Sequence, residues 1–481
     1  MLRNYFKIAW RNLKIEPFFT LLNMFGLAIG MAGSLLIALY IYDELSFNNT
    51  FSDAERIYRV NADVKFGGKV FNSAQVSDPV AQTLKKDLPQ VELATRFLNN
   101  SGLLLKKTAT DTNVKALKTT FVDSTFFDMF GVELQYGNPK TALVEANTLV
   151  LTKEAAEKHF GVKDALGKSL ILDNKTSYLV TGIIEDLPKN SILGDFSVFM
   201  SMSGNTRSRK NEWGSQDFVT FIKLSPNANM ASTKASIKGL FGKYVIPFVQ
   251  TMMPGITEKE FIASGNYFDF SIINLEDIHL HSTRPSVLYA NGSIKNVYIL
   301  ACIGLFLIVL ASVNFVNLST AYSLKRAKEV GIRKTLGSNK IELISQFLAE
   351  SGLITFISLI IAIAITAIAI PFFNDLSGKV IVLPFTKPLF WIVIFVATVF
   401  LGLLSGIYPA FYMSRFIPVD VLKGGASSNI GGVKTRQSLV VFQFAISVFL
   451  IVSTLVVFQQ LNFIQKKDLG YGKDRVLIIE D

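Results

Sequence analysis

The stretch SLKRAKEVGIRKTLGSNKIELISQFLAES, residues 323–351, decides how this chain is organised, because it lies between two long apolar runs. Its first eighteen residues contain six basic side chains and a single acid, Glu329. Further on the pattern becomes amphipathic, with Ile341, Ile344 and Leu348 on one side of a helix. The sequence therefore predicts a charged helix that bends into a membrane span and presents a surface to a soluble partner.

The composition favours a membrane protein. Half of the 481 residues are hydrophobic, 40 of them are Phe, and the hydrophobic residues cluster in runs. The single cysteine, Cys302, lies inside such a run, so no disulfide can form within the chain.

The net charge of +11 is concentrated in three short segments, 1–17, 323–340 and 414–437. They contain fourteen basic and three acidic residues, so together they account for the whole excess. This is the distribution that the positive-inside rule predicts for cytoplasmic loops. Nucleic acid is therefore not needed as a partner to explain the charge.

The apolar runs predict an α-helical membrane protein of about five spans with a large α+β extracytoplasmic domain. The first run, 18–42, has 25 residues and would be roughly 37 Å long as a helix, enough to cross a hydrocarbon core of about 30 Å. The predicted segments are a cytoplasmic amphipathic helix at 1–17, a first span at 18–42, an extracytoplasmic domain at 43–293, a membrane domain at 294–413 with three spans and the loop 323–340, a cytoplasmic loop at 414–437, a fifth span at 438–461, and the start of a second extracytoplasmic domain at 462–481.

The last predicted segment follows from an internal similarity. Residues 434–481 repeat the order of residues 3–60: a basic lead, a span, an acidic turn and a strand that carries an arginine. We therefore expect the chain to reach the beginning of a second copy of the unit.

The sequence contains neither a complete phosphate-binding loop nor a nucleophile elbow of the kind found in hydrolases. GVKDALGKS at 161–169 is similar to a phosphate-binding loop, but five residues separate Gly161 from Gly167, where such a loop needs four. The three histidines and the lack of a Gly-x-Ser-x-Gly elbow give no specific support for a nucleophilic enzyme. We therefore expect a non-catalytic chain without a bound cofactor, whose ATP hydrolysis, where it occurs, belongs to a partner.

Polar residues in unusual places have structural explanations that compete with functional ones. His279 and His281 would share one face of a strand and could bind a metal, but a strand that returns to the membrane surface is the favoured interpretation. Four polar residues lie within or beside the predicted spans: Asn23, Asn314, Asn317 and Glu350. They can be explained by hydrogen bonds between helices or by a path for a substrate.

The basic residues of the loop 323–340 have two possible explanations: they set the membrane topology, or they also contact a partner protein. Scattered basic residues would be enough to set the topology. A defined helix with Glu329 among the cations, Gly331 within it and a stop at 336–338 is more than topology requires. The contact role is therefore favoured.

Several segments of this sequence resemble those of a known protein family. KEVGIRKTLGS at 328–338, followed by LISQFLAE at 343–350, resembles the signature loop of ABC permeases of the MacB/FtsX type. NYFKIAWRNL at 4–13 resembles their amphipathic N-terminal helix. The segments RIYRV, AEKHFG, ALGKSL and LEDIHL resemble parts of their periplasmic core domain.

The resemblance implies a mechanical transmitter in the bacterial inner membrane, with a cytoplasmic N-terminus and residues 43–293 in the periplasm. A separate cytoplasmic ABC ATPase would bind ATP and move the spans, and the spans would move the periplasmic domain for export or envelope remodelling. A second permease unit or a homodimer, and a periplasmic adaptor, are further partners that it allows, and longer tandem relatives suggest that this chain is the first half of such a form. The implied ATPase-coupling residues are Lys325, Arg326, Lys328, Glu329, Arg333, Lys334 and Leu336.

A membrane-anchored sensor or scaffold without an ATPase partner is the alternative. It would bind a ligand with its outer domain and would ordinarily have one or two spans with an attached signalling domain. The clustered spans of this sequence favour the permease. In the permease reading, Arg333 and Lys334 are expected to face the ATPase.

Overall fold

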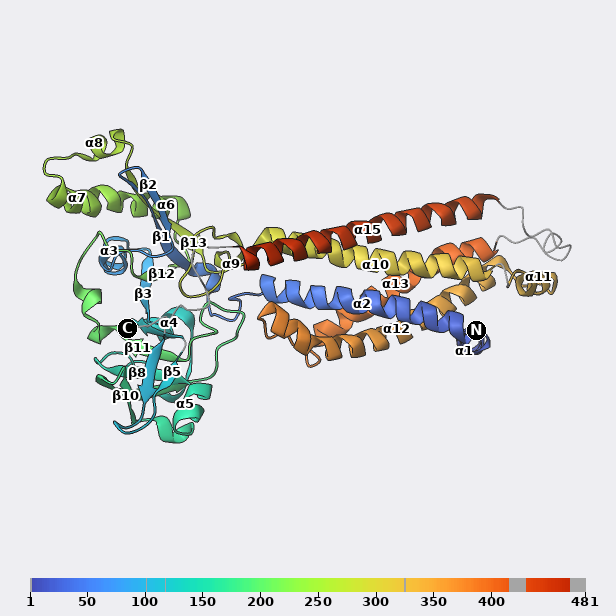
Figure 1. Ribbon diagram of the computed structural model, residues 1–481, viewed down its shortest axis with the longest axis horizontal. Helices are drawn as coiled ribbons and strands as arrows, with labels where there is room; N and C mark the ends of the chain where they lie inside the picture. Colours follow the sequence, from blue (N-terminus) through green and yellow to red (C-terminus); the bar gives the residue numbers. More distant parts are fainter. Residues whose placement is uncertain (1, 101, 117, 324–325, 415–429, 468–481) are drawn as a thin grey trace. The chain divides into compact units, whose positions relative to one another are not determined.

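Figure 1 shows the computed structural model of the chain, which describes residues 2–100, 102–116, 118–323, 326–414 and 430–467. The chain divides into two compact units. Residues 1–40 and 299–481 form what we term the helical unit, and residues 41–298 form the sheet unit. The tail at 468–481, where the start of a second domain is expected, lies outside the described residues.

Long helices running in a common direction make up the helical unit (Figure 1). The helices are α1 (Leu2–Ile15), α2 (Pro17–Leu45), α10 (Ile294–Ser323), α11 (Ala327–Thr335), α12 (Lys340–Ser377), α13 (Pro388–Ser414) and α15 (Ile430–Lys466). Within the described residues, α2, α10, α12, α13 and α15 are long and apolar enough to cross a membrane. The predicted fold class is therefore confirmed.

The loop predicted at 414–437 is shorter than expected, because α15 begins at Ile430. Continuing the helix satisfies backbone groups at 430–437 by intrahelical bonds where a loop would leave them to water. Residues 415–429, which belong to the same predicted loop, lie outside the described part of the chain.

Glycines allow the spanning helices to pack closely. A Cβ atom built at Gly30 on α2 would lie 2.5 Å from the Cβ of Ala311 on α10. A Cβ atom at Gly406 on α13 would lie 2.8 Å from the Cβ of Ser351 on α12. Lipid offers little hydrophobic driving force for association between helices, so close backbone approach at small residues supplies much of the attraction.

The sheet unit is built on one mixed sheet of thirteen strands within its described residues. The strands are β1 (Ile57–Phe66), β2 (Lys69–Ser73), β3 (Val91–Asn99), β4 (Leu103–Lys106), β5 (Val114–Ala116), β6 (Thr119–Val122), β7 (Leu134–Gly137), β8 (Thr148–Thr152), β9 (Ser169–Leu172), β10 (Thr176–Ile184), β11 (Val198–Ser201), β12 (Val219–Leu224) and β13 (Tyr267–Asn274). Their order is β13-β1-β12-β3-β6-β11-β8-β10-β9-β4-β5, with β2 added to β1 and β7 to β10. The pairs β6–β11 and β8–β10 are parallel, and the other pairs are antiparallel.

Short helices accompany the sheet. They are α3 (Pro79–Asp87), α4 (Phe126–Phe130), α5 (Lys153–His159), α6 (Met230–Leu240), α7 (Ile246–Met252), α8 (Glu258–Ala263) and α9 (Ile278–His281). A π-helical turn, Phe241–Val245, joins α6 to α7. Figure 1 shows α6, α7 and α8 near the β1–β2 hairpin at one end of this unit, and α5 near β8 and β10 at the other end.

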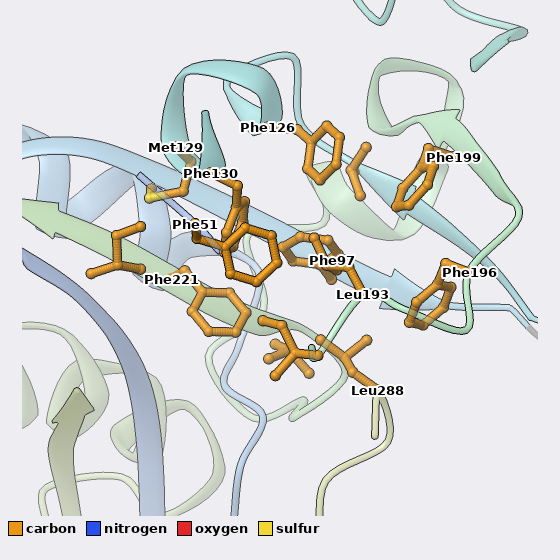
Figure 2. Packing of buried hydrophobic residues seen from close by; sticks show 14 of the residues in the cluster. Phe51, Phe97, Phe126, Met129, Phe130, Leu193, Phe196, Phe199, Phe221 and Leu288 are labelled. Carbon is orange, nitrogen blue, oxygen red and sulfur yellow. The ribbon is translucent and has the colours of Figure 1, made fainter. Parts of the chain in front are cut away.

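A phenylalanine cluster forms part of the core of the sheet unit, as Figure 2 shows. The ring of Phe97 on β3 lies 5.6 to 6.0 Å from the rings of Phe126, Phe130 and Phe221, in edge-on arrangements. These four side chains are almost completely buried. Edge-to-face contacts of this kind add about 0.5–1.5 kcal/mol per pair to the burial term, so the cluster fixes how β3, β12 and α4 meet.

Candidate coupling site and the buried arginine of the sheet unit

Helix α11 is the structured part of the predicted coupling loop. Its buried face, which includes Ala327 and Val330, packs against Leu343 and Phe347 of α12 and against Met413 of α13. The segment ends at Gly337, whose φ of +96° favours glycine. The next helix, α12, starts where the Glu342 carboxylate accepts the backbone N–H of Asn339 at 3.1 Å. The sequence pattern of a helix, a stop and a second helix is thus present in the structure.

Arg326 fastens α11 to the spanning helix α12. Its Nη1 donates to both carboxylate oxygens of Glu350, at 2.9 and 3.0 Å, and its Nε donates to Glu329 at 3.1 Å. The Arg326 and Glu350 side chains are only 10% and 16% exposed. Burial alone would lower the pKa of Arg326, but Glu350 and Glu329 outweigh it and raise that pKa, so the guanidinium stays charged. We term Arg326, Glu329 and Glu350 the coupling junction.

The coupling junction also reaches the N-terminal helix and an aromatic ring. The Nδ2 of Asn12 on α1 lies 3.4 Å from Glu350 Oε2, a long hydrogen bond. The guanidinium of Arg326 lies 5.1 Å from the centroid of the Phe347 ring, which is within cation–π range. Contacts to α1, α11 and α12 therefore converge on one ion pair.

Arg333 and Lys334 bond to their own chain, although the sequence predicted that they face the partner. Arg333 donates to Gln346 of α12 through Nη1, at 2.5 Å, and its Nη2 lies 2.7 Å from Glu329. The ammonium of Lys334 donates to the backbone carbonyl of Ser414 on α13 at 2.7 Å, and burial lowers its pKa. The sequence could not reveal the bonds to Gln346 and Ser414, because these acceptors lie 13 and 80 residues further along the chain.

The exposed face of α11 and its flanks has a different composition. The Lys328 side chain is exposed, Ile332 is half exposed, and Leu336 and Ile341 are 82% and 76% exposed. Lys325, the first of the predicted coupling residues, lies outside the described residues. Within the predicted set, bonds inside the chain and exposure therefore differ from residue to residue, and contact with an ATPase stays a prediction.

The sheet unit contains a fully buried arginine that the sequence did not single out. Arg59 on β1 donates to Asn61 Oδ1 at 2.9 Å, to the Tyr289 hydroxyl at 2.7 Å and to Ser282 Oγ at 2.7 Å. Its exposed fraction is 0%. Burial lowers the pKa of Arg59, which the Tyr289 hydroxyl opposes, and burial raises the pKa of Tyr289. We call these four residues the Arg59 network; it ties β1 to the segment that precedes α10.

His279 and His281 do not share a strand face, because this segment is the short helix α9. The Nε2 of His279 lies 3.0 Å from the Glu44 carboxylate, both side chains are buried, and the Phe47 ring stacks on the imidazole at 3.9 Å. His281 is exposed. Residues two apart on a helix point in different directions, which is why only one of the two histidines enters the core. Among the described residues, no group of three His, Cys, Asp or Glu side chains is placed to hold a metal ion.

The amide of Asn317, another of the polar residues noted in the spans, donates to Gln443 of α15 at 3.3 Å. The Asn317–Gln443 and Arg326–Glu350 contacts are both of the helix–helix kind, which was one of the two explanations for polar residues in the spans. Glu350 was among the residues noted from the sequence, but its partner Arg326, 24 residues earlier, was not paired with it there.

Two regions of the chain match known protein families. Residues 20–240 match the family model of the MacB-like periplasmic core domain, and residues 301–418 match that of the FtsX-like permease C-terminal region. The macrolide export ATP-binding/permease protein MacB of Hahella chejuensis is 23% identical over 87% of this chain and 59% of its own length. The protein of the same name from Aggregatibacter actinomycetemcomitans is 24% identical over 59% of this chain and 39% of its own.

Solved structures give weaker likenesses. A domain of a permease protein from Porphyromonas gingivalis is 24% identical, covers 47% of this chain and 91% of its own, and has a TM-score of 0.40. The periplasmic region of MacB from Actinobacillus actinomycetemcomitans is 18% identical, covers 48% and 92%, and has a TM-score of 0.33. The chain spans 39–59% of the length of the two MacB relatives. From its two matched regions and its apolar helices, the chain belongs to the MacB/FtsX family of ABC transporter permeases.

Proposed function

We propose that this chain is the membrane subunit of a transporter whose ATP is bound and hydrolysed by a separate cytoplasmic ATPase. The observation that carries the proposal is the ion pair in which Nη1 of Arg326 donates to both carboxylate oxygens of Glu350. This buried pair joins the loop helix α11 to the spanning helix α12, so a displacement of α11 is passed to the membrane instead of being absorbed by a flexible linker. Hydrogen bonds between charged groups are suited to this because they are shorter and stronger than bonds between neutral groups.

In this proposal the exposed face of α11 is the contact surface for the ATPase. Leu336 and Ile341, which flank α11, supply apolar contacts, and the exposed Lys328 supplies charge, a combination that is common in protein interfaces. Arg326, Glu329, Arg333 and Lys334 act as positioning residues, since their bonds are made within the chain.

The proposed topology places the N-terminus and α11 in the cytoplasm and the sheet unit in the periplasm. Motion that starts at α11 would then move the sheet unit and drive export or envelope remodelling. A second permease unit or a homodimer would complete the membrane part, and a periplasmic adaptor could extend it. The chain itself would bind no ATP or other cofactor and would catalyse no reaction.

The test uses the full-length tagged chain, solubilised from its native membranes in a mild detergent. We expect ATPase activity in the eluate, and a loss of about ten-fold or more when Leu336→Asp and Lys328→Glu are combined. Leu376→Asp is the matched control, because Leu376 is 87% exposed and lies near the other end of α12. It should keep the ATPase bound.

Two results would contradict the proposal in different ways. Undiminished ATPase in the Leu336→Asp, Lys328→Glu eluate would place the contact elsewhere on the chain. An eluate of the unmodified chain without any ATPase would instead support the membrane-anchored sensor or scaffold.

A further inference from the structure

The β1–β2 hairpin of the sheet unit has an open edge. It turns through Gly67 and Gly68, both with positive φ, and pairs Phe66 with Lys69 across the turn. In a two-residue hairpin the pair that closes the turn is hydrogen-bonded, and the bonding alternates from there. Val70 and Asn72 therefore direct their backbone N–H and C=O groups away from β1. Within the described residues, β1 is the only strand that pairs with β2.

An apolar groove of about 360 Å³ lies beside this edge. The hairpin contributes Phe66 and Phe71 to it, α7 contributes Phe248 and Met252, and the loop before β12 contributes Trp213. None of its lining residues is charged. Phe71 and Met252 are 53% and 59% exposed, so the groove holds apolar surface that the described part of the chain leaves open to solvent.

The wall of the groove is fixed next to the open edge. The side chain of Gln75, just beyond β2, donates to the Asp217 carbonyl at 2.7 Å, and Val76 forms a bridge with Phe218. The segment that carries Trp213 is thereby attached to the end of β2. An added strand would run along β2 and direct every second side chain toward the groove, on the face of Phe71.

The charges next to the hairpin turn are basic, and the acid further along β1, Asp63, is paired with Arg284. Lys69 is opposite Phe66 and so lies on the same face of the hairpin as the groove, while Lys65 is on the other face. Neither ammonium group forms an ion pair with the residues that the structure describes. A lysine can protect an edge strand from unwanted pairing, but exposed Phe66, Val70 and Phe71 around it suit a ligand that is apolar and acidic.

We propose that β2 and its groove bind an extended peptide segment of a partner protein, with apolar side chains at alternate positions and an acidic residue near the hairpin turn. Backbone bonds to Val70 and Asn72 provide affinity, the groove selects the apolar side chains, and Lys69 selects the acid. This site goes beyond the ATPase coupling and does not depend on it.

The experiment selects short random peptides, displayed on phage, against the full-length chain in detergent. We expect selected peptides to alternate apolar and polar residues and to carry an acid toward one end. Asn72→Pro removes only the outward N–H, because Asn72 is not hydrogen-bonded to β1, and proline is tolerated at such edge positions. We expect it to weaken peptide binding about ten-fold or more, and Phe71→Ala to do the same.

Two further variants complete the test. Lys69→Glu should weaken binding most at low salt, since the charges there are exposed. Leu179→Ala, at a 43% exposed leucine on β10, is the control and should leave binding unchanged.

The proposal would be overturned by selected peptides that lack the alternating pattern, or by binding that survives both Asn72→Pro and Phe71→Ala. It would also be overturned if these two variants abolish self-association of the chain, measured by its mass in detergent, because the occupant would then be a second copy.

Discussion

The coupling junction of the helical unit and the Arg59 network of the sheet unit both bury an arginine, but they balance its charge differently. Arg326 is paired with two carboxylates, those of Glu350 and Glu329. The described partners of Arg59 are three neutral oxygen atoms, on Asn61, Ser282 and Tyr289. An ion pair fails as a whole when one partner is removed, whereas a neutral network loses one bond at a time. In the proposed function the coupling junction would transmit force, whereas the Arg59 network holds a chain segment in place.

The largest effect is expected for Glu350→Ala. It leaves the buried Arg326 without the less exposed of its two carboxylate partners, and removing one partner of a buried ion pair costs about 3–5 kcal/mol. Thermal unfolding of the full-length chain in detergent should show a clear loss of stability. Replacing both partners, with Arg326→Met and Glu350→Leu together, should recover most of it, because an apolar pair of similar volume leaves no charge unpaired. A double variant as unstable as Glu350→Ala would mean that the charge is not the reason.

Tyr289→Phe tests the neutral network and should have a smaller effect. It removes one oxygen that accepts from the Arg59 guanidinium, and hydrogen bonds to charged groups contribute about 1.5–3 kcal/mol. Tyr267→Phe, at a 38% exposed tyrosine on β13, is the control and should be neutral. Equal losses from Glu350→Ala and Tyr289→Phe would remove the contrast between the two regions.

The smallest effect is expected for Gly292→Ala, next to the Glu44–His279 contact. A Cβ atom there would lie 2.6 Å from His279 Nε2 and 2.7 Å from Glu44 Oε2, so one of these buried side chains must shift. Overpacking of this kind costs about 1–3 kcal/mol. Gly239→Ala, on α6 with no heavy atom within 4 Å of the added Cβ, should instead be neutral or slightly stabilising. The two variants can be compared by thermal unfolding followed through tryptophan fluorescence; matching midpoints would show that His279 and Glu44 move apart at little cost.

The course of the chain through the membrane could be predicted from local pattern. Apolar runs of 24 residues or more and the clustering of basic residues are properties of consecutive residues, so they predicted five spans, and five described helices are long and apolar enough to cross a membrane. Which strands share the phenylalanine cluster depends on pairings such as β3 with β12 that no local pattern encodes.

The candidate coupling site was predicted only as a set of residues on one loop. Periodicity could place Lys328 and Leu336 on a helix, but it could not separate them from Arg333 and Lys334. That separation depends on Gln346 and Ser414, which reach the loop only after α12 and α13 have packed. The prediction of a strand at His279 and His281 was wrong for a related reason. A short segment can form a strand or a helix, and tertiary packing determines which one is formed.

The sequence by itself determined the five spans, the basic loop with its helix and stop, and the family, because these depend on hydrophobicity, charge and motif order along the chain. The tertiary structure alone decided that Arg326 pairs with Glu350, that Arg59 is held by Ser282 and Tyr289, and that β2 keeps an open edge. These contacts join residues 24 to 230 positions apart, and their free energy exists only when folding brings the partners together and excludes water.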